Sequence, residues 1–144
     1  MKTIGLLGGM SWESTALYYR LINEGARRAL GGTHSAPIAM VSVDFHEIEA
    51  LQHAGDWGET AKILSRKAQQ VEQAGADFLL ICTNTMHKVA DEISGAIGIP
   101  VLHIADATAR AIRAAGIGTV AVSYTHLTLP TTGSLCRSRG WAAH

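Results

Sequence analysis

Long apolar runs, basic clusters and abundant cysteines are all missing from this chain of 144 residues. Its 12 basic and 12 acidic residues balance, and with no basic run the sequence argues against nucleic acid as a partner. No apolar stretch reaches the roughly 20 residues that a membrane-spanning helix needs, so we expect no membrane partner. The first residues, from Met1 to Ile4, lack the longer apolar core and cleavage pattern of a signal peptide.

The two cysteines, Cys82 and Cys136, are too few for the disulfide framework of a small secreted domain. We therefore expect a reduced, cytoplasmic protein. The length is sufficient for one domain with a hydrophobic core and too short for two full domains.

Short apolar runs alternate with helical patterns along most of the chain. The apolar runs predict buried strands at residues 3–7, 38–43, 77–82 and 101–104, and a fifth strand that starts at 119–122. Helical spacing, capping residues and closing glycines predict helices at 11–30, 46–54, 56–75, 86–97 and 107–115. This alternation is typical of βαβ units, so the sequence predicts an α/β fold with a parallel sheet and helices on both faces.

The pattern ends near Val122. The next ten residues, SYTHLTLPTT (123–132), have neither helical nor strand periodicity, although a strand that has just begun should lead to a loop and a helix. This stretch resembles translated library-adapter sequence. We therefore expect a domain at 1–122 followed by an aberrant, non-native tail at 123–144; a natural disordered tail is the alternative.

In an open parallel sheet, ligands bind beyond the carboxyl ends of the strands. Four segments in such positions carry glycines and small polar residues, and exposed helix N-termini there would suit a carboxylate. They are residues 8–11, 44–46, 83–87 and 105–106. Histidines are also present nearby, but none has the HExxH arrangement, and Cys82 with His87 is a weak ligand set, so we expect no metal site.

The strongest local signal is the segment Cys82-Thr83-Asn84-Thr85-Met86-His87. A thiol between a buried strand and a helix N-terminus is placed where a cysteine pKa is lowered. Asn84 and Thr85 add groups that could hydrogen-bond a carboxylate. The alternative is that Cys82 is a small core residue and that residues 83–85 only cap the next helix.

Five segments resemble the amino-acid racemases of the aspartate/glutamate racemase superfamily. They are GLLGGMSWEST (5–15), YYRLINEG (18–25), SVDFHEIE (42–49), CTNTMHKVAD (82–91) and LHIADAT (102–108). The resemblance covers about residues 1–122, in order. It implies the N-terminal half of a two-domain α/β protein, whose similar halves face each other across the active site and which works without pyridoxal phosphate or another cofactor.

The resemblance also implies a reaction, the racemisation of an acidic amino acid such as aspartate or glutamate. Two residues, one from each half, stand on opposite faces of the substrate Cα; one removes the proton and the other returns it. Because an unactivated α-proton is a very weak acid, the base must be well placed in a dry site. This chain would then be an incomplete enzyme. The alternatives are a non-catalytic carboxylate-binding or amino-acid-binding domain, and another superfamily enzyme such as a maleate isomerase or a decarboxylase.

In much of the superfamily the catalytic cysteine directly precedes Asn-Thr. Here Thr83 holds that position and Cys82 lies one residue earlier, a step that reverses the side-chain direction along a strand. The resemblance thus assigns the acid/base position to Thr83 and keeps Cys82 as its chemical competitor. The residues implied in substrate binding are Met10, Gln52, Thr83, Asn84 and Thr85, although Gln52 could equally be an exposed polar residue on a short helix. An exposed half-to-half surface would also favour self-association, for instance as a homodimer.

Overall fold

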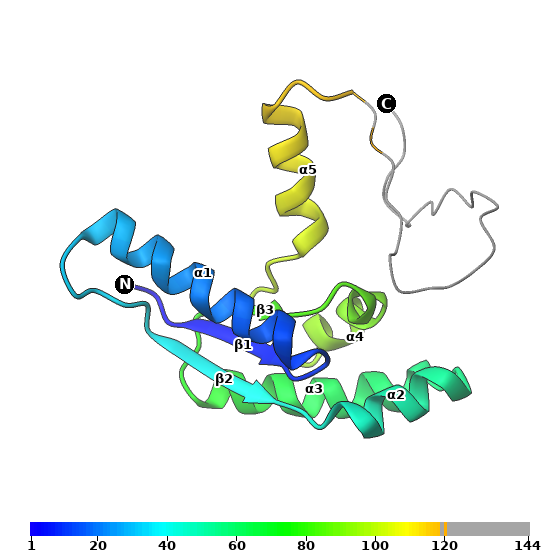
Figure 1. Ribbon diagram of the computed structural model, residues 1–144. Helices are drawn as coiled ribbons and strands as arrows, with labels where there is room; N and C mark the ends of the chain where they lie inside the picture. The colour runs from blue at the N-terminus through cyan, green and yellow to red at the C-terminus, as the bar shows by residue number, and fades with distance from the viewer. Residues whose placement is uncertain (119, 121–144) are drawn as a thin grey trace. The chain divides into compact units, whose positions relative to one another are not determined.

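The computed structural model describes residues 1–118 and 120. Its sheet has three parallel strands in the order β2-β1-β3 (Figure 1). These are β1 (Ile4–Gly8), β2 (Ile38–Ser42) and β3 (Phe78–Ile81). In the central strand, Ile4 is paired with Ile38 on one side and with Phe78 on the other. The predicted α/β class with a parallel sheet is therefore confirmed.

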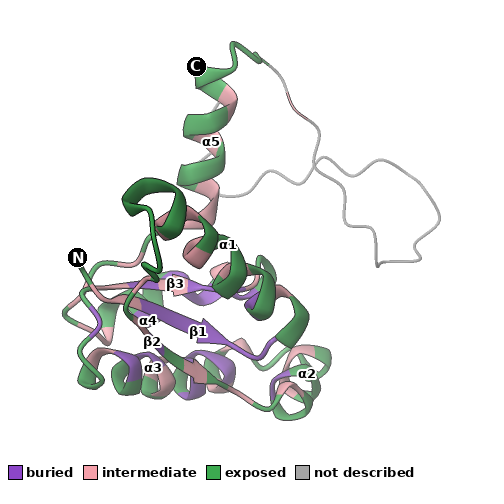
Figure 2. Ribbon diagram, turned by 60° about the vertical axis from the view of Figure 1, so that its left-hand side comes forward, coloured by how far each residue is buried: buried purple, intermediate pink, exposed green. Residues whose placement is uncertain are grey.

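Helices cover the two faces of the sheet unequally. The helices are α1 (Trp12–Leu30), α2 (Phe45–Ala54), α3 (Trp57–Gln73), the 3₁₀ helix η1 (Thr85–Val89), α4 (Ala90–Gly95) and α5 (Ile104–Ala114). The main core lies between the sheet and α3, where Leu64, Ala68 and Val71 are buried together with strand residues such as Leu79 (Figure 2). On the opposite face, α1 buries only Thr15. That face therefore keeps apolar side chains exposed.

Three helices begin at polar cap residues, of which Ser11 and Asp56 were expected as caps and Asp44 was not. Ser11 Oγ accepts a hydrogen bond from the amide of Ser14 at the start of α1. Asp44 and Asp56 do the same for α2 and α3, each at 3.0 Å. An N-cap oxygen satisfies one of the amides that have no partner within the helix, and this explains the positions of the three helix starts.

The structure corrects two of the predicted elements. The helix expected at 86–97 is a 3₁₀ turn followed by the short α4, because Val89 departs from helical geometry with φ −112° and ψ 21°. The strand expected at 101–104 is reduced to one bridge between Val101 and Leu79. Helix α5 already starts at Ile104, three residues before its predicted start, so no room remains for a longer strand.

By its internal contacts the chain divides into a unit of Met1–Thr108, which contains the sheet, and a unit of Ala109–His144. The predicted fifth strand at 119–122 lies almost wholly outside the described residues, and so do the tail at 123–144 and Cys136. Within the described part of the chain, no helix is both long and apolar enough to cross a membrane.

Candidate functional site

The segments that leave the three strands start side by side at the carboxyl edge of the sheet. The carbonyl oxygen of Gly8 accepts a hydrogen bond from the amide of Val43, at 3.0 Å. On the other side, the carbonyl of Leu7 accepts one from the amide of Cys82, at 2.9 Å. The loop after β1 therefore lies between the segments that follow β2 and β3, as expected for the ligand-binding edge of a parallel sheet.

The loop after β1 is a tight turn that requires its two glycines. Gly9 has φ +91°, and a Cβ there would collide with the backbone of Val43; a Cβ on Gly8 would collide with the side chain of Thr15. The amide of Gly9 donates to Thr15 Oγ1 at 3.0 Å, and the Thr15 hydroxyl donates to the carbonyl of Ser11 at 3.1 Å. The GGMSWEST segment therefore closes the loop onto the first turn of α1.

Two of the predicted substrate-binding residues belong to other segments than the turn after β3. The side chain of Met10 is only 3% exposed and belongs to the main core, so a ligand at this edge would meet its main chain. Gln52 is half-buried near the end of α2. At a rise of ~1.5 Å per residue, it lies roughly 12 Å along the helix from the N-cap Asp44.

The other four predicted residues are consecutive and differ sharply in exposure. Cys82 is 1% exposed, Thr83 is half-buried, and both Asn84 and Thr85 are exposed. The alternation expected from strand geometry thus separates Cys82 from Thr83 at the point where β3 ends. The exposed side chains of this turn are therefore the amide of Asn84 and the hydroxyl of Thr85.

Burial raises the pKa of the Cys82 thiol to about 12. The expectation of a lowered pKa is therefore wrong. The thiol is desolvated, and its nearest polar contact is the carbonyl of Leu80 at 4.0 Å from Sγ. The phenol of Tyr18, on α1, has its pKa raised first by burial and then by the neighbouring Cys82. A group in these surroundings is costly to ionise, in agreement with the alternative of a core cysteine.

Sequence reasoning missed His87, which it considered only as a metal ligand. His87 Nδ1 is 2.8 Å from the carbonyl oxygen of Thr83, and its ring centroid is 4.3 Å from that of His103. Burial, and then the charge of His103, lower the pKa of His87. The signal was present: both histidines fall inside the segments CTNTMHKVAD and LHIADAT.

No group of three or more His, Cys, Asp or Glu residues among the described residues is arranged to hold a metal ion. The edge instead offers hydroxyls and side-chain and main-chain amides. Such groups can donate hydrogen bonds to a carboxylate.

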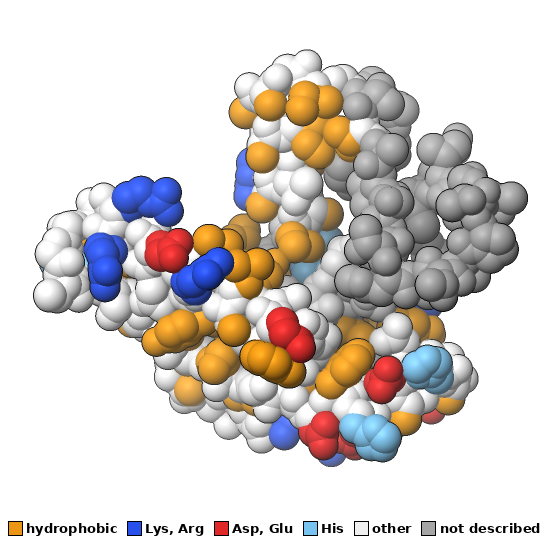
Figure 3. All heavy atoms as spheres, in the orientation of Figure 1, with side chains coloured by type: hydrophobic (Ala, Val, Ile, Leu, Met, Phe, Trp, Pro, Cys, Tyr) orange, Lys and Arg blue, Asp and Glu red, His pale blue; other side chains and the backbone are white. Residues whose placement is uncertain are grey.

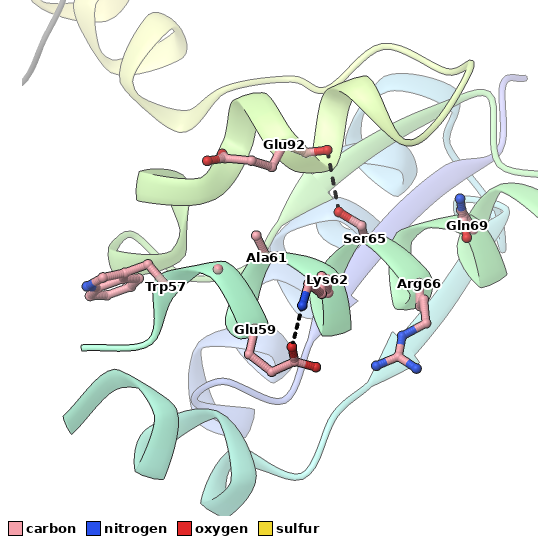
Figure 4. A pocket seen from close by; sticks show the side chains of 9 residues that line it. Trp57, Glu59, Ala61, Lys62, Ser65, Arg66, Gln69 and Glu92 are labelled. Carbon is pink, nitrogen blue, oxygen red and sulfur yellow. Dashed lines mark hydrogen bonds and ion pairs between the residues drawn. The ribbon is translucent and has the colours of Figure 1, made fainter. Parts of the chain in front are cut away.

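A groove of about 690 Å³ lies elsewhere, between α3 and α4, and is open to solvent (Figure 4). On its floor Lys62 forms an ion pair with Glu59 at 2.9 Å, and Ser65 donates to the carbonyl of Glu92 at 3.4 Å. At its end, the Lys88 ammonium lies 3.9 Å from the ring centroid of Trp57. None of the predicted site residues lines this groove, so the strand ends remain the candidate site.

The sequence of this chain is similar to that of known racemases. The Asp/Glu/hydantoin racemase family profile matches residues 7–134. The chain is 27% identical over 114 residues to RacX of Bacillus subtilis (strain 168), a broad-specificity amino-acid racemase, and this match covers 76% of the chain and 48% of the relative.

Two solved structures are similar as well. One is a candidate Asp/Glu racemase from Yersinia pestis, with 58% identity and a TM-score of 0.79, covering 82% of this chain and 51% of that one. The other is an aspartate racemase homologue from Pyrococcus horikoshii OT3, with 33% identity and a TM-score of 0.74, covering 81% and 50%. The chain thus spans about half the length of each. On the family match over most of its length, this chain is a member of the Asp/Glu/hydantoin racemase family.

Proposed function

We propose that this chain is the N-terminal half of a cofactor-independent racemase of acidic amino acids. In this proposal the half binds aspartate or glutamate at the carboxyl edge of its sheet and supplies one of the two proton-transfer groups. The observation that carries the proposal is the turn after β3, where Thr83 is half-buried, Asn84 and Thr85 are exposed, and Cys82 is buried. We place the reaction in the cytoplasm, in keeping with the low cysteine content.

The proposed reaction moves one proton off the substrate Cα and another onto its opposite face. A base takes the Cα proton and leaves a carbanion next to the carboxylate; an acid on the other face then protonates that carbanion. Thr83 Oγ1 is our candidate for the group on this side. A thiol with a pKa of about 12 that is 1% exposed is poorly suited to the role, which disfavours Cys82. Since a hydroxyl is a weak base, we expect unequal rates in the two directions.

Substrate binding in this proposal relies on neutral hydrogen-bond donors. Asn84 and Thr85 are exposed beside Thr83 and would hold a substrate carboxylate, together with main-chain amides of the loop that contains Met10. Gln52 would reach the far end of the substrate from α2. No cofactor is needed for this chemistry.

The second proton-transfer group would come from outside this chain, since the chain spans about half of its relatives. The thinly covered face of the sheet offers a surface for such a partner, either a second half or a second copy of this chain. Leu17 and Leu21 of α1 are 45% and 50% exposed, and Met40 of β2 is 49% exposed. Figure 3 shows hydrophobic side chains gathered over α1 and the adjacent sheet. Burying such a patch would favour association.

Hydrogen exchange at Cα tests the proposal. The full chain is incubated in D₂O with L-aspartate or L-glutamate, loss of the Cα proton signal is followed by NMR, and enantiomers are separated by chiral chromatography. Exchange without inversion would support one working group on this half. Thr83→Ala should abolish the exchange, while Cys82→Ala, a matched change one residue away, should retain it.

Other outcomes discriminate between the alternatives. Binding of the amino acid by calorimetry, with no exchange at all, would favour a non-catalytic binding domain. Release of bicarbonate from a malonate-type substrate would favour a decarboxylase. Exchange that survives in Thr83→Ala and is lost in Cys82→Ala would assign the acid/base role to the thiol and overturn our choice.

A further inference from the structure

The imidazoles of His87 and His103 accept hydrogen bonds from the first amides of α5. The ring nitrogen Nε2 of His87 is 3.4 Å from the amide nitrogen of Ile104, and Nδ1 of His103 is 3.1 Å from that of Ala105. The first amides of a helix have no acceptor within it. Ser, Thr, Asp and Asn usually satisfy them, whereas here two histidines in edge-to-face contact, with an interplanar angle of 62°, take that role.

The partners of His87 determine which of its nitrogens carries the proton. Nδ1 faces the carbonyl oxygen of Thr83 at 2.8 Å, so this nitrogen must donate. Nε2 faces the amide of Ile104 and must accept, through the longer and weaker of the two bonds. A neutral ring protonated at Nδ1 is the one state that satisfies both. His103, whose Nδ1 accepts from Ala105, needs the opposite tautomer, with its proton on Nε2.

We propose that His87, fixed in its Nδ1-protonated tautomer, is a positioning residue that holds the main chain of Thr83 against the first turn of α5 and thereby sets the direction of the Thr83 side chain. The inference rests on the proposed function for the role of Thr83, and on the geometry for the tautomer. The amide of Cys82 is fixed to Leu7 at 2.9 Å, so the Thr83 carbonyl is the next point along the chain at which the turn is held.

The surroundings of the ring favour its neutral form. His103 is the titratable group in ring contact with it, and a charge on that ring opposes a second charge on His87. The amide ends of α5 carry positive partial charge, which also opposes protonation of His87. Burial, the largest cause, also lowers the pKa of His87, whereas backbone hydrogen bonds to Thr83 and Asn84 act in the opposite direction. The neutral donor–acceptor arrangement therefore persists at neutral pH.

NMR on the full chain labelled with ¹⁵N-histidine tests the tautomer without reference to activity. Long-range ¹H–¹⁵N correlations at pH 7.5 should show His87 protonated at Nδ1 and unprotonated at Nε2, and His103 the reverse. The His87 signals are assigned by their loss in His87→Gln. Protonation of His87 at Nε2, or rapid averaging of its two tautomers, would overturn the proposal.

Two substitutions of His87 test its two hydrogen bonds separately. Asparagine places an amide N–H near the position of Nδ1, so His87→Asn should keep the bond to Thr83. Glutamine reaches toward the position of Nε2, so His87→Gln should lose that bond. We expect Cα exchange to fall about tenfold in His87→Gln, the rate equivalent of one neutral hydrogen bond, and to be largely retained in His87→Asn. The exposed His34, changed to Gln, is the matched control.

The positioning role of His87 can be tested even if the chain has no racemase activity. If the wild-type chain shows no Cα exchange, the amide signals of Thr83 and Asn84 replace activity as the readout. They should shift or broaden in His87→Gln and stay near their wild-type positions in His87→Asn. Equal behaviour of the two variants, in either readout, would refute the positioning role. If His87→Gln fails to fold, the His87 signals are assigned by their loss in His87→Asn, and the wrong tautomer in the wild-type chain still overturns the proposal.

Discussion

The burial of Cys82 has a measurable consequence at alkaline pH. The pKa of its thiol is raised from an ordinary value of 9.0 to about 12 in the folded chain. The unfolded chain therefore loses this proton at lower pH than the folded chain does. Below about pH 9 both states keep the proton and the contribution to stability is complete; it is lost progressively as the pH rises from 9 toward 12.

The magnitude follows from the size of the shift. Three pKa units at ~1.4 kcal/mol each correspond to about 4 kcal/mol of free energy of unfolding lost by pH 12. Little discount for solvent screening applies, since the side chain is 1% exposed. A second consequence concerns reactivity. At pH 8 the thiolate population of folded Cys82 should be about a thousandfold below that of an ordinary thiol.

Urea unfolding between pH 7.5 and 10.5 measures the first effect, and labelling with a disulfide reagent at pH 8 measures the second. Both use a Cys136→Ser background, so that Cys82 is the remaining cysteine of the chain. A Cys82→Ala variant in the same background should lose the part of the alkaline slope that belongs to the thiol. Equal slopes in the two chains, or labelling of native Cys82 as fast as in urea, would refute the argument from burial and reopen Cys82 as a reactive group.

Three further predictions use other parts of the chain. Because the pKa of His87 is lowered in the folded state, the unfolded chain binds a proton there at higher pH than the folded chain does. Stability should therefore fall as the pH drops below about 6.5. In thermal unfolding, His87→Phe should remove this part of the dependence of stability on pH. Gly9→Ala should cost more than ~2 kcal/mol in urea unfolding, given its φ of +91°, whereas Gly25→Ala, in open space within α1, should change stability by about 0.5–1 kcal/mol in the stabilising direction. Replacing Leu17 and Leu21 with Glu should reduce self-association in analytical ultracentrifugation, and unchanged sedimentation would exclude this face as the interface.

The α/β class could be predicted from the sequence because local signals and tertiary structure agree over most of the chain. Apolar runs of five or six residues became the three strands, and Ser11 and Asp56 cap helices where their spacing indicated. The region after Met86 could not be predicted in the same way. There α5 starts early because histidine side chains satisfy its first amides, and the propensity of single residues carries no information about such tertiary partners.

The sequence correctly predicted a turn at the carboxyl end of β3, and the role of this turn as a site stays a prediction. The rule that ligands bind at strand carboxyl ends identified the turn after β3, and the one-residue offset separated Cys82 from Thr83. The direction of the Cys82 pKa shift was wrong, because it was argued from the following helix N-terminus. The sequence alone could not reveal that the thiol is desolvated beside Tyr18 of α1, 64 positions earlier in the chain.

The burial of Cys82 and the hydrogen bond that holds the Thr83 carbonyl both arise where β3 ends. The strand ends at Ile81, and the next residue, Cys82, is buried as well, while Thr83 beyond it is half-buried. A residue beyond the end of a strand gains exposure but loses the fixed side-chain direction that a strand provides. The hydrogen bond from His87 to the Thr83 carbonyl restores that direction without covering the side chain. If Thr83 transfers the proton, we therefore expect substitution of His87 to lower the rate of proton transfer more than any other change outside residues 82–85. The ring of His87 contacts the Thr83 carbonyl directly.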